Sequence, residues 1–493
     1  MPAQPTTKWQ VSGYRFLVRR MEHALVRRDV RMLHDPMRSQ SRALMVGAII
    51  AILALAACGI LALIRPQDKI GDNKIVVGKD SGAMFVVIGD TLHPVMNLAS
   101  ARLITGAAAK PAIVKESEIE KRSRGSLVGI PGAPSALPYD SAGSGRAWTV
   151  CDSIAIDGSL AITTSVIVGE PERGEGISEL GAGRALLVRS GDGTTYLVYD
   201  GKRAQIDTNN RALVAALALE GRTPRPISAG LLNAIPAAPA ITPPAIAGAR
   251  TRPSYDMQGQ LVGSVVQSTR GESAEYYVLL TDGIQRVSSA TMELIRFDDS
   301  VSAEIARVPP DLVADAPHVN TLPVATYPET VPAPLETGDN PVSCLTWQPV
   351  SGAESNRSAA LADVTVTAGR ALPISGSAKE VRLAQADGSG DKADAVYLHP
   401  GTGAYVQTTG IQPDSQRKDS SFFVADTGVR YGIVDADAAK ALGFEGAAEP
   451  APWQIVSLLA PGSPLGRREA LVAYDGAIPE SPAAVDGVVP AGN

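Results

Sequence analysis

The side chains that most often carry catalysis or bind metal ions are few and scattered in this 493-residue chain. None of its histidines belongs to an HExxH motif, there is no CxxC pair, and no GxSxG turn presents a nucleophilic serine. The five histidines are His23, His34, His93, His318 and His399. Asp435 and Asp437 lack the glycine that a calcium loop needs at its sixth position, so Asp435 is predicted to cap a helix. The sequence therefore predicts no catalytic residue, no metal ligand and no cofactor.

A nucleotide-binding loop of the form GxxxxGK[ST] does not occur in the sequence. The nearest fragments are Gly78-Lys79-Asp80 and Gly201-Lys202-Arg203, and neither has the following Ser or Thr that would bind magnesium. Both fall where hairpin turns are expected, and turns select glycine and polar residues. We therefore interpret both fragments as turn residues.

An uninterrupted apolar run of 22 residues extends from Ala43 to Ile64 and contains no charge. At 1.5 Å per helical residue, a run of this length crosses the hydrocarbon core of a bilayer. Pro66 follows it and cannot donate an amide hydrogen to continue a helix. The sequence therefore predicts a transmembrane helix over residues 43–64.

Charge predicts the orientation of this helix. Residues 1–42 contain nine Lys or Arg against three acidic residues, a net charge of +6. Because basic residues near a membrane stay in the cytoplasm, residues 1–42 are predicted to be cytoplasmic and the rest external. The whole chain carries −6, so about −12 belongs to the residues after 42, which argues against nucleic acid as a partner.

The apolar run differs from two other kinds of N-terminal segment, a cleaved signal peptide and a lipoprotein signal. A cleaved signal peptide has an apolar core of about 7 to 15 residues, so this run is too long for one. The tetrapeptide ending at Cys58 looks like a lipobox, but the apolar run continues beyond it to Ile64. Cys58 is therefore interpreted as a small residue within the span.

The two remaining cysteines, Cys151 and Cys344, both lie on the predicted external side, where oxidation is permitted. Each has a tryptophan close by, Trp148 and Trp347. We predict a disulfide between them. The alternative is two buried free thiols, because a sequence does not reveal the distance between two Cα atoms.

The external region repeats one pattern four times: strand, turn, aromatic-apolar strand, tight turn, strand and helix-like segment. The second turns are Gly89-Asp90, Asp200-Gly201, Asp282-Gly283 and Asp426-Thr427-Gly428, residue types that tolerate the positive φ of tight hairpins. Pro-rich exits follow, including GIPGAP at 129–134 and AIPAAP at 234–239. Aromatics are only 4% of the chain, and Gly and Pro are abundant, which favours a body rich in strands and loops.

Segments between these units also correspond, because each contains a Cys near a Trp followed by an alternating strand. The external body is therefore predicted to be two related halves with a pseudo-twofold relation. The expected divisions are 1–42, cytoplasmic basic amphipathic segment; 43–64, span; 74–135, 181–246, 259–330 and 381–473, repeat units 1 to 4; 146–180 and 341–380, central domain; and 474–493, disordered tail.

The chain resembles EccB, the single-span membrane component of mycobacterial type VII (ESX) secretion systems. The resemblance rests on GYRFLVRR, the span, NLASARLI, GIPGAP, the cysteine pair and DTGVRYGI, and it covers essentially the whole chain. GLLNAIPAAP, LAQADG and DAVYL resemble the paralogue of the fourth ESX system. The resemblance implies a mycobacterial or related actinobacterial source and an inner (plasma) membrane location. It also implies four repeats around a central β domain in a periplasmic body.

The resemblance further implies a scaffold that joins EccC, EccD and EccE and associates with other copies of itself. Residues 11–32 would form a cytoplasmic amphipathic helix that contacts EccD or EccC, with Phe16, Leu17, Met21 and Leu25 on its apolar face. Adsorption of this basic helix on anionic membrane lipid is the alternative, and the two are compatible.

Two further functions remain open. The repeats resemble a cell-wall-binding subunit of a phage lysin, so a module that binds peptidoglycan or another cell-envelope polymer is the alternative function. The low aromatic content makes carbohydrate recognition less favoured. Family members are sometimes described as ATPases, but without the phosphate-binding loop an ATP hydrolase ranks third. The sequence thus favours a structural and assembly component of a secretion channel over an enzyme.

Overall fold

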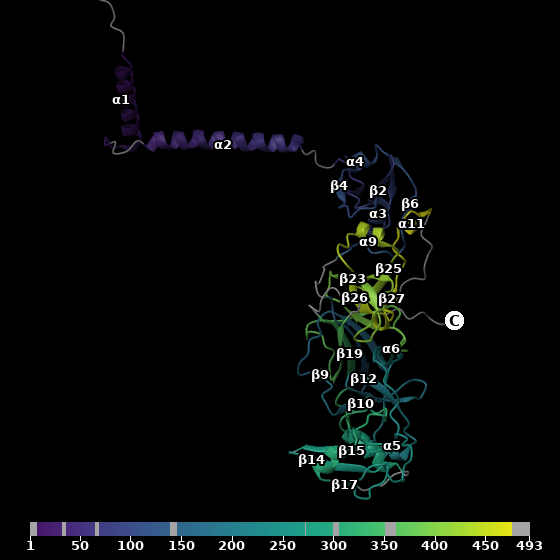
Figure 1. Ribbon diagram of the computed structural model, residues 1–493. Coiled ribbons are helices and arrows are strands. Elements are labelled where there is room, and N and C mark those ends of the chain that lie inside the picture. Colours follow the sequence, from purple (N-terminus) through teal and green to yellow (C-terminus); the bar gives the residue numbers. More distant parts are fainter. Residues whose placement is uncertain are drawn as a thin grey trace, which may run out of the picture.

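Two helices precede an elongated body in the computed structural model (Figure 1). The structure describes residues 7–31, 36–64, 69–138, 145–271, 273–298, 305–350 and 361–475. The first helix, α1, spans Lys8–Arg27, and the second, α2, spans Pro36–Ile64. Within α2, Ser41–Leu61 is long and apolar enough to cross a membrane, and the body buries none of it. The expected span, Ala43 to Ile64, therefore lies within one continuous helix.

Unit 1 shows the plan that the repeats share. Its first three strands form an antiparallel meander, and two later strands return parallel to the first and the third, giving the order β4-β1-β2-β3-β5. The elements are β1 Ile75–Gly78, β2 Met84–Ile88, β3 Thr91–Pro94, α3 Leu98–Thr105, β4 Ala112–Val114, α4 Glu116–Ile119 and β5 Ser123–Arg124. Apolar residues of the strands, such as Val76 and Val86, are fully buried.

Unit 4 copies this order strand for strand as β26-β23-β24-β25-β27. Its elements are β23 Gly403–Thr409, β24 Ser421–Ala425, β25 Val429–Ile433, α9 Ala436–Leu442, β26 Glu449–Pro452, α10 Trp453–Val456 and β27 Ala460–Pro461. Another short helix, α11 Arg467–Ala470, follows. Gly89 in unit 1 and Gly428 in unit 4 have positive φ at equivalent turns, as the sequence predicts.

Units 2 and 3 keep the meander, the helix and the returning parallel strand. In unit 2 the elements are β10 Arg184–Arg189, β11 Thr195–Tyr199, β12 Lys202–Ile206, α5 Arg211–Ala216, β13 Arg225–Pro226 and α6 Ala229–Ala234, and β18 Ala333–Pro334 also pairs with β10. In unit 3 they are β14 Val265–Arg270, β15 Ser273–Leu279, β16 Ile284–Val287, α7 Ser289–Phe297, β17 Ala306–Arg307 and α8 Pro310–Asp315. The prediction of four related repeats is confirmed.

The helix after each meander begins at the same kind of residue. A short polar side chain accepts a hydrogen bond from a backbone amide in the first turn. These N-cap residues are Asn97, Asn210, Ser288 and Asp435. For Asp435, Oδ1 lies 2.7 Å from the Ala438 amide, so the predicted capping role is confirmed.

A seven-stranded central sheet joins the units in the order β21-β22-β8-β7-β19-β20-β9. Its strands are β7 Trp148–Ile154, β8 Ile162–Val168, β9 Ile177–Glu179, β19 Val342–Pro349, β20 Ala362–Gly369, β21 Val381–Arg382 and β22 Ala395–Tyr397. Hairpins β7-β8 and β19-β20 meet side by side at β7 and β19. β9, which follows the first hairpin, pairs with β20 of the second, and β22, which follows the second hairpin, pairs with β8 of the first. This exchange supports the predicted relation between two halves.

Two expected boundaries differ from the structure. Repeat unit 4 was expected to begin at residue 381, but β21 and β22 belong to the central sheet, where Ala395 lies beside Ser165 of β8. A short apolar strand such as β22 would be buried in the sheet of unit 4 or in the central sheet, so its sequence does not indicate which sheet it joins. The expected tail began at 474, but β28 Ala473–Tyr474 pairs with β6 Leu127–Val128. Residues 476–493 lie outside the described part, and the other boundaries remain predictions.

The units pack in two pairs. In one pair, α3 of unit 1 lies against α9 and α11, and Arg102 Nη1 donates to the carbonyl of Leu442 at 2.7 Å. In the other, α5 packs on α7, and the Tyr199 hydroxyl donates to the carbonyl of Thr326 at 2.7 Å. Figure 1 shows unit 1 at the end of the body nearest α2 and unit 3 at the opposite end, with the central sheet between.

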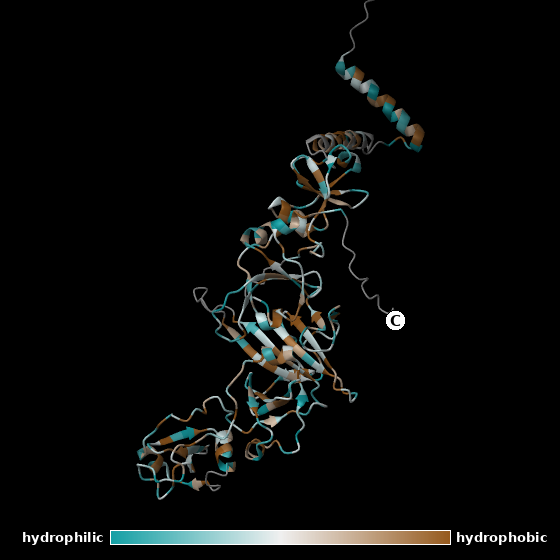
Figure 2. Ribbon diagram, turned by 90° about the vertical axis from the view of Figure 1, so that its right-hand side faces the viewer, coloured by the Kyte–Doolittle hydropathy of each residue, from teal (hydrophilic) through white to brown (hydrophobic). Residues whose placement is uncertain are grey.

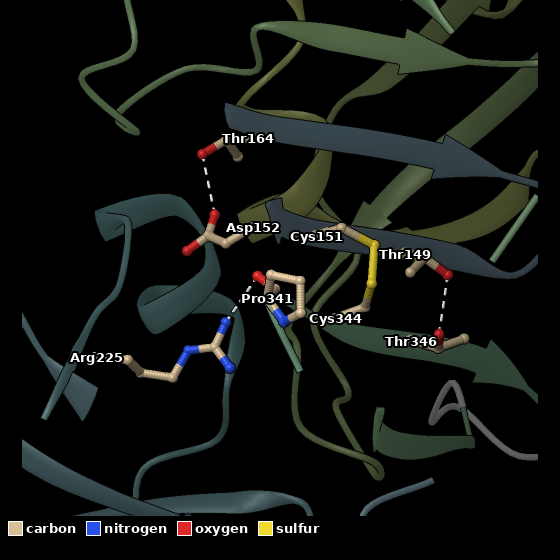
Figure 3. The surroundings of a disulfide bond; sticks show 8 residues. All are labelled: Thr149, Cys151, Asp152, Thr164, Arg225, Pro341, Cys344 and Thr346. Atoms are coloured by element: carbon tan, nitrogen blue, oxygen red, sulfur yellow. Dashed lines mark hydrogen bonds between the residues drawn. A yellow bond between two sulfur atoms is a disulfide. The ribbon is translucent and has the colours of Figure 1, made fainter. Parts of the chain in front are cut away.

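Cys151 and Cys344 form a disulfide at the centre of this sheet (Figure 3). They are directly opposed across β7 and β19, their Cα atoms are 4.0 Å apart, and both are fully buried. A twofold axis through this bond would exchange the two hairpins. The disulfide therefore links equivalent points of the two halves, 193 residues apart in sequence.

Asp152, next to the disulfide on β7, connects the central sheet to unit 2. Its Oδ1 accepts from the Thr164 hydroxyl at 3.0 Å (Figure 3). Its Oδ2 accepts from the Ser228 amide at 2.7 Å, at the start of α6. Burial raises the pKa of the Asp152 carboxyl, and hydrogen bonds from Ser228 and Thr164 oppose the shift. The carboxylate thus has defined partners and is shielded from solvent.

Arg225 of β13 reinforces the same junction. Its guanidinium donates to the carbonyls of Asn340 at 2.7 Å and Pro341 at 3.0 Å, immediately before β19. Burial lowers the pKa of Arg225 to about 10, while the charge of Asp152 raises it. Because its donors meet backbone carbonyls from the other half of the sheet, we assign Arg225 a structural role.

Replacing both Cys151 and Cys344 with Ser should lower the free energy of unfolding by about 2–5 kcal/mol, because the bond restrains a long loop of the unfolded chain. The guanidinium unfolding midpoint, followed by tryptophan fluorescence, measures the change, since Trp148 and Trp347 are buried in the same sheet. Cys58→Ser in the span is the control and should leave the midpoint unchanged. Equal midpoints for the double variant and the unmodified chain would contradict a stabilising bond.

Asp152→Asn should cost about 1 kcal/mol of stability, because the amide has one acceptor oxygen instead of two: if Ser228 keeps that oxygen, the Thr164 hydroxyl has to turn and accept from the amide nitrogen. The raised folded pKa means that the folded state holds the proton more tightly than the unfolded state, so this carboxyl stabilises most below its ordinary pKa and less as pH rises. The advantage of the unmodified chain over Asp152→Asn should therefore shrink from about pH 4 to 7.

Unfolding midpoints across this pH range test the expectation. Asp363→Asn, at an exposed carboxyl on β20 of the same sheet, is the matched control and should change the midpoint little. A pH-independent difference for Asp152→Asn would be evidence against the burial argument.

Candidate interface surfaces

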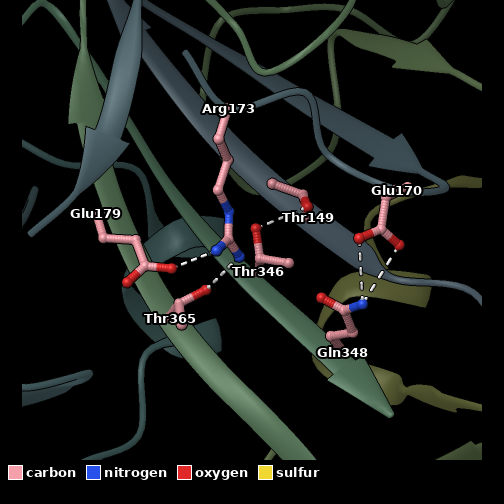
Figure 4. A network of polar contacts seen from close by, with 7 residues as sticks. All are labelled: Thr149, Glu170, Arg173, Glu179, Thr346, Gln348 and Thr365. Atoms are coloured by element: carbon pink, nitrogen blue, oxygen red, sulfur yellow. Dashed lines mark hydrogen bonds and ion pairs between the residues drawn. The ribbon is translucent and has the colours of Figure 1, made fainter. Parts of the chain in front are cut away.

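One face of the central sheet is lined by polar side chains that satisfy one another (Figure 4). The Thr149 and Thr346 hydroxyls, on the paired strands β7 and β19, are 2.9 Å apart and buried. Arg173, in the segment after β8, donates to the Thr365 hydroxyl at 3.2 Å and forms an ion pair with Glu179. The same segment therefore folds back over the sheet and covers it.

The polar contacts on this face fit a structural cover better than a reaction centre. The side chains of Arg173 and Glu179 are 36% and 52% exposed, so water screens their ion pair. Gln348 reaches the Glu170 carboxylate only at 3.3 to 3.4 Å. No nucleophile with an adjacent base is brought together by these contacts.

The two lysine-containing fragments weighed as phosphate loops lie in hairpin turns. Gly78-Lys79-Asp80 connects β1 to β2, and Glu116 Oε1 accepts from the amides of Asp80 at 3.1 Å and Ser81 at 2.9 Å. These hydrogen bonds, of which the one from Ser81 has the larger effect, lower the pKa of Glu116 to about 2. The hydrogen bond and the negative charge of Glu116 in turn raise the pKa of Asp80. A carboxylate therefore occupies the amide donors that a phosphate would need.

The second fragment, Gly201-Lys202-Arg203, starts β12 and is held by aromatic rings. The Lys202 ammonium lies 5.0 Å from the Tyr199 ring centre, and the Arg203 guanidinium lies 5.3 Å from that of Tyr196. Gly201 has a φ of +71°, as the tight turn requires. Both basic groups therefore lie against the sheet of unit 2.

The histidines are not brought together among the described residues. His93 Nδ1 lies 3.0 Å from the Ser126 carbonyl in unit 1, His318 Nε2 lies 3.1 Å from the Val313 carbonyl in unit 3, and His399 is an exposed loop residue. His23 is on α1, and His34 lies outside the described residues. In the described ranges, no group of three or more His, Cys, Asp or Glu could hold a metal ion.

The most conspicuous unpartnered surfaces are apolar. On α1, polar and apolar residues alternate in the colouring of Figure 2, and its amphipathic face is exposed. The expected contact residues Phe16, Leu17, Met21 and Leu25 are 56%, 57%, 64% and 81% exposed. α2 is likewise uncovered over its apolar stretch. Both helices therefore have surfaces suited to lipid or to other protein chains.

Unit 4 adds an aromatic surface that the sequence reasoning did not identify. Trp453, the first residue of α10, is 40% exposed, and its ring stacks on Phe422 with centres 5.7 Å apart. The Arg430 guanidinium lies 5.1 Å from the Trp453 ring centre, and burial lowers its pKa. One sequence feature could have predicted the exposure of this tryptophan: it lies in the Pro-rich segment PAPWQ, where a buried strand residue is not expected.

Comparisons with known proteins agree over nearly the entire chain. A family described as type VII secretion system ESX-1, transport TM domain B, matches residues 3–479. The ESX-3 secretion system ATPase EccB3 of Mycolicibacterium smegmatis is 41% identical, covering 95% of this chain and 91% of that protein. The ESX-1 secretion system ATPase EccB1 of Mycobacterium tuberculosis, strain CDC 1551, is 38% identical, with 95% of each covered.

Solved structures extend the likeness to the fold. A chain of an intact ESX-5 inner membrane complex is similar with a TM-score of 0.75 and 31% identity, covering 99% of both chains. A chain of the EccB3 dimer from the ESX-3 core complex is similar with a TM-score of 0.70 and 38% identity, covering 81% of this chain and all of that one.

The family prediction is therefore confirmed, whereas the finer prediction of a fourth-system paralogue is not supported, because these proteins belong to ESX-1, ESX-3 and ESX-5. The sequence match, the apolar helix α2 and the β-rich body lead to one conclusion: the chain belongs to the EccB family of type VII secretion systems.

Proposed function

We propose that this chain is a structural and assembly component of an ESX inner-membrane complex and supports protein export by holding the complex together. The observation that carries the proposal is the match over 99% of both chains to a member of an intact ESX-5 inner membrane complex. Both helices and the body take part in that match. The function is thus one of binding and shape.

The topology follows from the same elements. The chain crosses the inner membrane once through α2, with the basic N-terminal segment in the cytoplasm and the body in the periplasm. A related chain forms a periplasmic assembly in the ESX-5 complex and covers 85% of this chain. The body, which lies after the span, is the part that would form such an assembly here.

The chain is expected to associate with copies of itself and with EccC, EccD and EccE. A dimer of the related EccB3 supports self-association. The exposed apolar face of α1 is the surface proposed to contact EccD or EccC, and membrane lipid is the compatible alternative for the same face. The proteins reported above favour an ESX-3-like system, since the highest of their identities, 41%, is with an ESX-3 component.

Binding to the cell envelope is the second candidate function. The observation that favours it is the exposed ring of Trp453 beside Phe422 and Arg430, because flat aromatic rings are surfaces on which sugar rings can stack. This aromatic surface is small, and sugar binding by one such cluster would require neither the long body nor the span. The assembly role therefore explains more of the molecule.

An ATP hydrolase ranks third. Relatives are named ATPases, but in this chain both lysine fragments lie at turns: Glu116 occupies the amide donors of the first, and the basic groups of the second lie against tyrosine rings. They also lie in the periplasmic body, away from cytoplasmic ATP. We propose that any hydrolysis in the assembled complex belongs to another subunit.

Purification through a C-terminal tag in mild detergent should recover EccC-like, EccD-like and EccE-like proteins together with more than one copy of this chain. Mass spectrometry identifies the partners, and light scattering measures the mass of the complex. A chain recovered alone in detergent but retained on isolated cell-wall sacculi would contradict the assembly role and favour envelope binding.

A pair of α1 variants tests the docking surface in the same purification. Leu17→Gln with Met21→Gln should reduce partner recovery, whereas Arg19→Gln with Glu22→Gln, which leaves the net charge unchanged, should not. Full recovery with the first pair would overturn docking through α1 while leaving the assembly role intact.

Lys79→Ala combined with Lys202→Ala should leave ATP hydrolysis by the purified complex unchanged, because neither lysine has a phosphate-binding environment. Steady-state phosphate release measures the rate. A loss of activity in a variant that still assembles would contradict the assignment of hydrolysis to another subunit.

A further inference from the structure

A cleft of about 570 Å³ opens on unit 1, where the chain enters the body after α2. Five parts of the chain build it: the entering segment 70–74, the end of β2 with its turn, the end of α3, Arg122 just before β5, and α11 with the Leu471 that follows it. Ile104 on the wall is 5% exposed, and Ile88 is partly buried. The cleft is therefore partly apolar and joins the first unit to the last.

Three cationic side chains from distant parts of the sequence line this cleft: Lys74, Arg122 and Arg467. All three residues are exposed, and Asp72 is the one acidic residue in the lining. Within the described residues, no ion pair engages any of the three cationic groups. Their convergence is unusual in a region of the chain that carries about −12 overall. A bound anion would relieve their mutual repulsion.

The position of the cleft limits what the anion can be. α2 ends at Ile64 and the cleft begins at Ile70, so the chain between them spans at most about 20 Å. The cleft is thereby tethered close to the outer headgroup layer. At its edge, Leu471 is 43% and the neighbouring Val472 is 45% exposed. Apolar and cationic groups side by side match an amphiphile better than a free ion.

We propose that this cleft binds the phosphate of an anionic phospholipid in the outer leaflet of the inner membrane. Lys74, Arg122 and Arg467 receive the phosphate, and Leu471 and Val472 contact the apolar region below the headgroup. Free inorganic phosphate shares the charge recognition but has nothing to place against the apolar edge. The proposal rests on the single-span topology given above and adds a ligand that topology alone does not require.

The test uses the full chain reconstituted in vesicles, with Cys58→Ala and Ser123→Cys, an exposed position next to Arg122, so that one free thiol beside the cleft carries an environment-sensitive dye. Increasing the fraction of phosphatidylglycerol in phosphatidylcholine vesicles should shift the dye emission to the blue. Neutralising the cleft with Lys74→Gln, Arg122→Gln and Arg467→Gln should raise the lipid fraction needed for half the shift by at least about fivefold, since each surface cation attracts anionic lipid.

The matched control removes the same charge from unit 3 and the segment before it, with Arg252→Gln, Arg286→Gln and Arg307→Gln at exposed positions, and should keep the original response. An unchanged midpoint in the cleft variant, or an equal shift in pure phosphatidylcholine, would overturn the proposal. An equal shift on adding inorganic phosphate to phosphatidylcholine vesicles would assign the cleft to free phosphate and also overturn it. Cleavage of a C-terminal tag by external protease measures the orientation of the chain in the vesicles. A wrong topology can therefore be told apart from a failure of the cleft to bind lipid.

Discussion

The pairing of β7 with β19 is the interaction on which the rest of the body depends. Six residue pairs place Cys151 opposite Cys344 and Trp148 opposite Trp347, and every other strand of the central sheet is added outward from this pair. One face of the sheet packs against α6 of unit 2 and α10 of unit 4 through a shared core. Separating β7 from β19 would therefore remove the support of two units at once.

The repeat units are small, and they pack so that their cores are shared. Domains of this size bury a limited share of their surface, so they gain from sharing a core. Units 1 and 4 do so through Val86, Leu103, Phe423 and Leu442 in one continuous cluster. In units 2 and 3, Leu294 of α7 enters the core of unit 2. Exposed helices and the cleft remain for external contacts.

Much of this arrangement could be predicted from local patterns. The apolar run gave the span, turn residues such as Gly89 and Gly428 marked the meanders, and Asp435 was recognised as a cap because capping depends on neighbouring residues. The position of the two cysteines outside the span suggested their pairing. The span, the turns and the helix cap depend on residues close together in the sequence, and the disulfide prediction depends on the compartment in which the two cysteines lie.

Features that depend on distant contacts were missed. β22 was assigned to the fourth repeat because its neighbour in the fold, β8, is more than 200 residues away in sequence. The cleft joins Lys74 to Arg467, and no local pattern relates those two residues. Trp453 was not singled out because exposure of a lone aromatic depends on the packing of α10.

The order of the chain does not follow the order of the units in space, and this constrains biogenesis. β7 precedes its partner β19 in the chain by almost 200 residues. Unit 1, which adjoins the span, packs against α9 and α11, which lie near the other end of the chain. The first half of the periplasmic polypeptide alone cannot form these contacts, because their partners lie in the second half. The core shared by units 1 and 4 can therefore be completed only after α9 and α11, near the other end of the chain, have reached the same side of the membrane as unit 1.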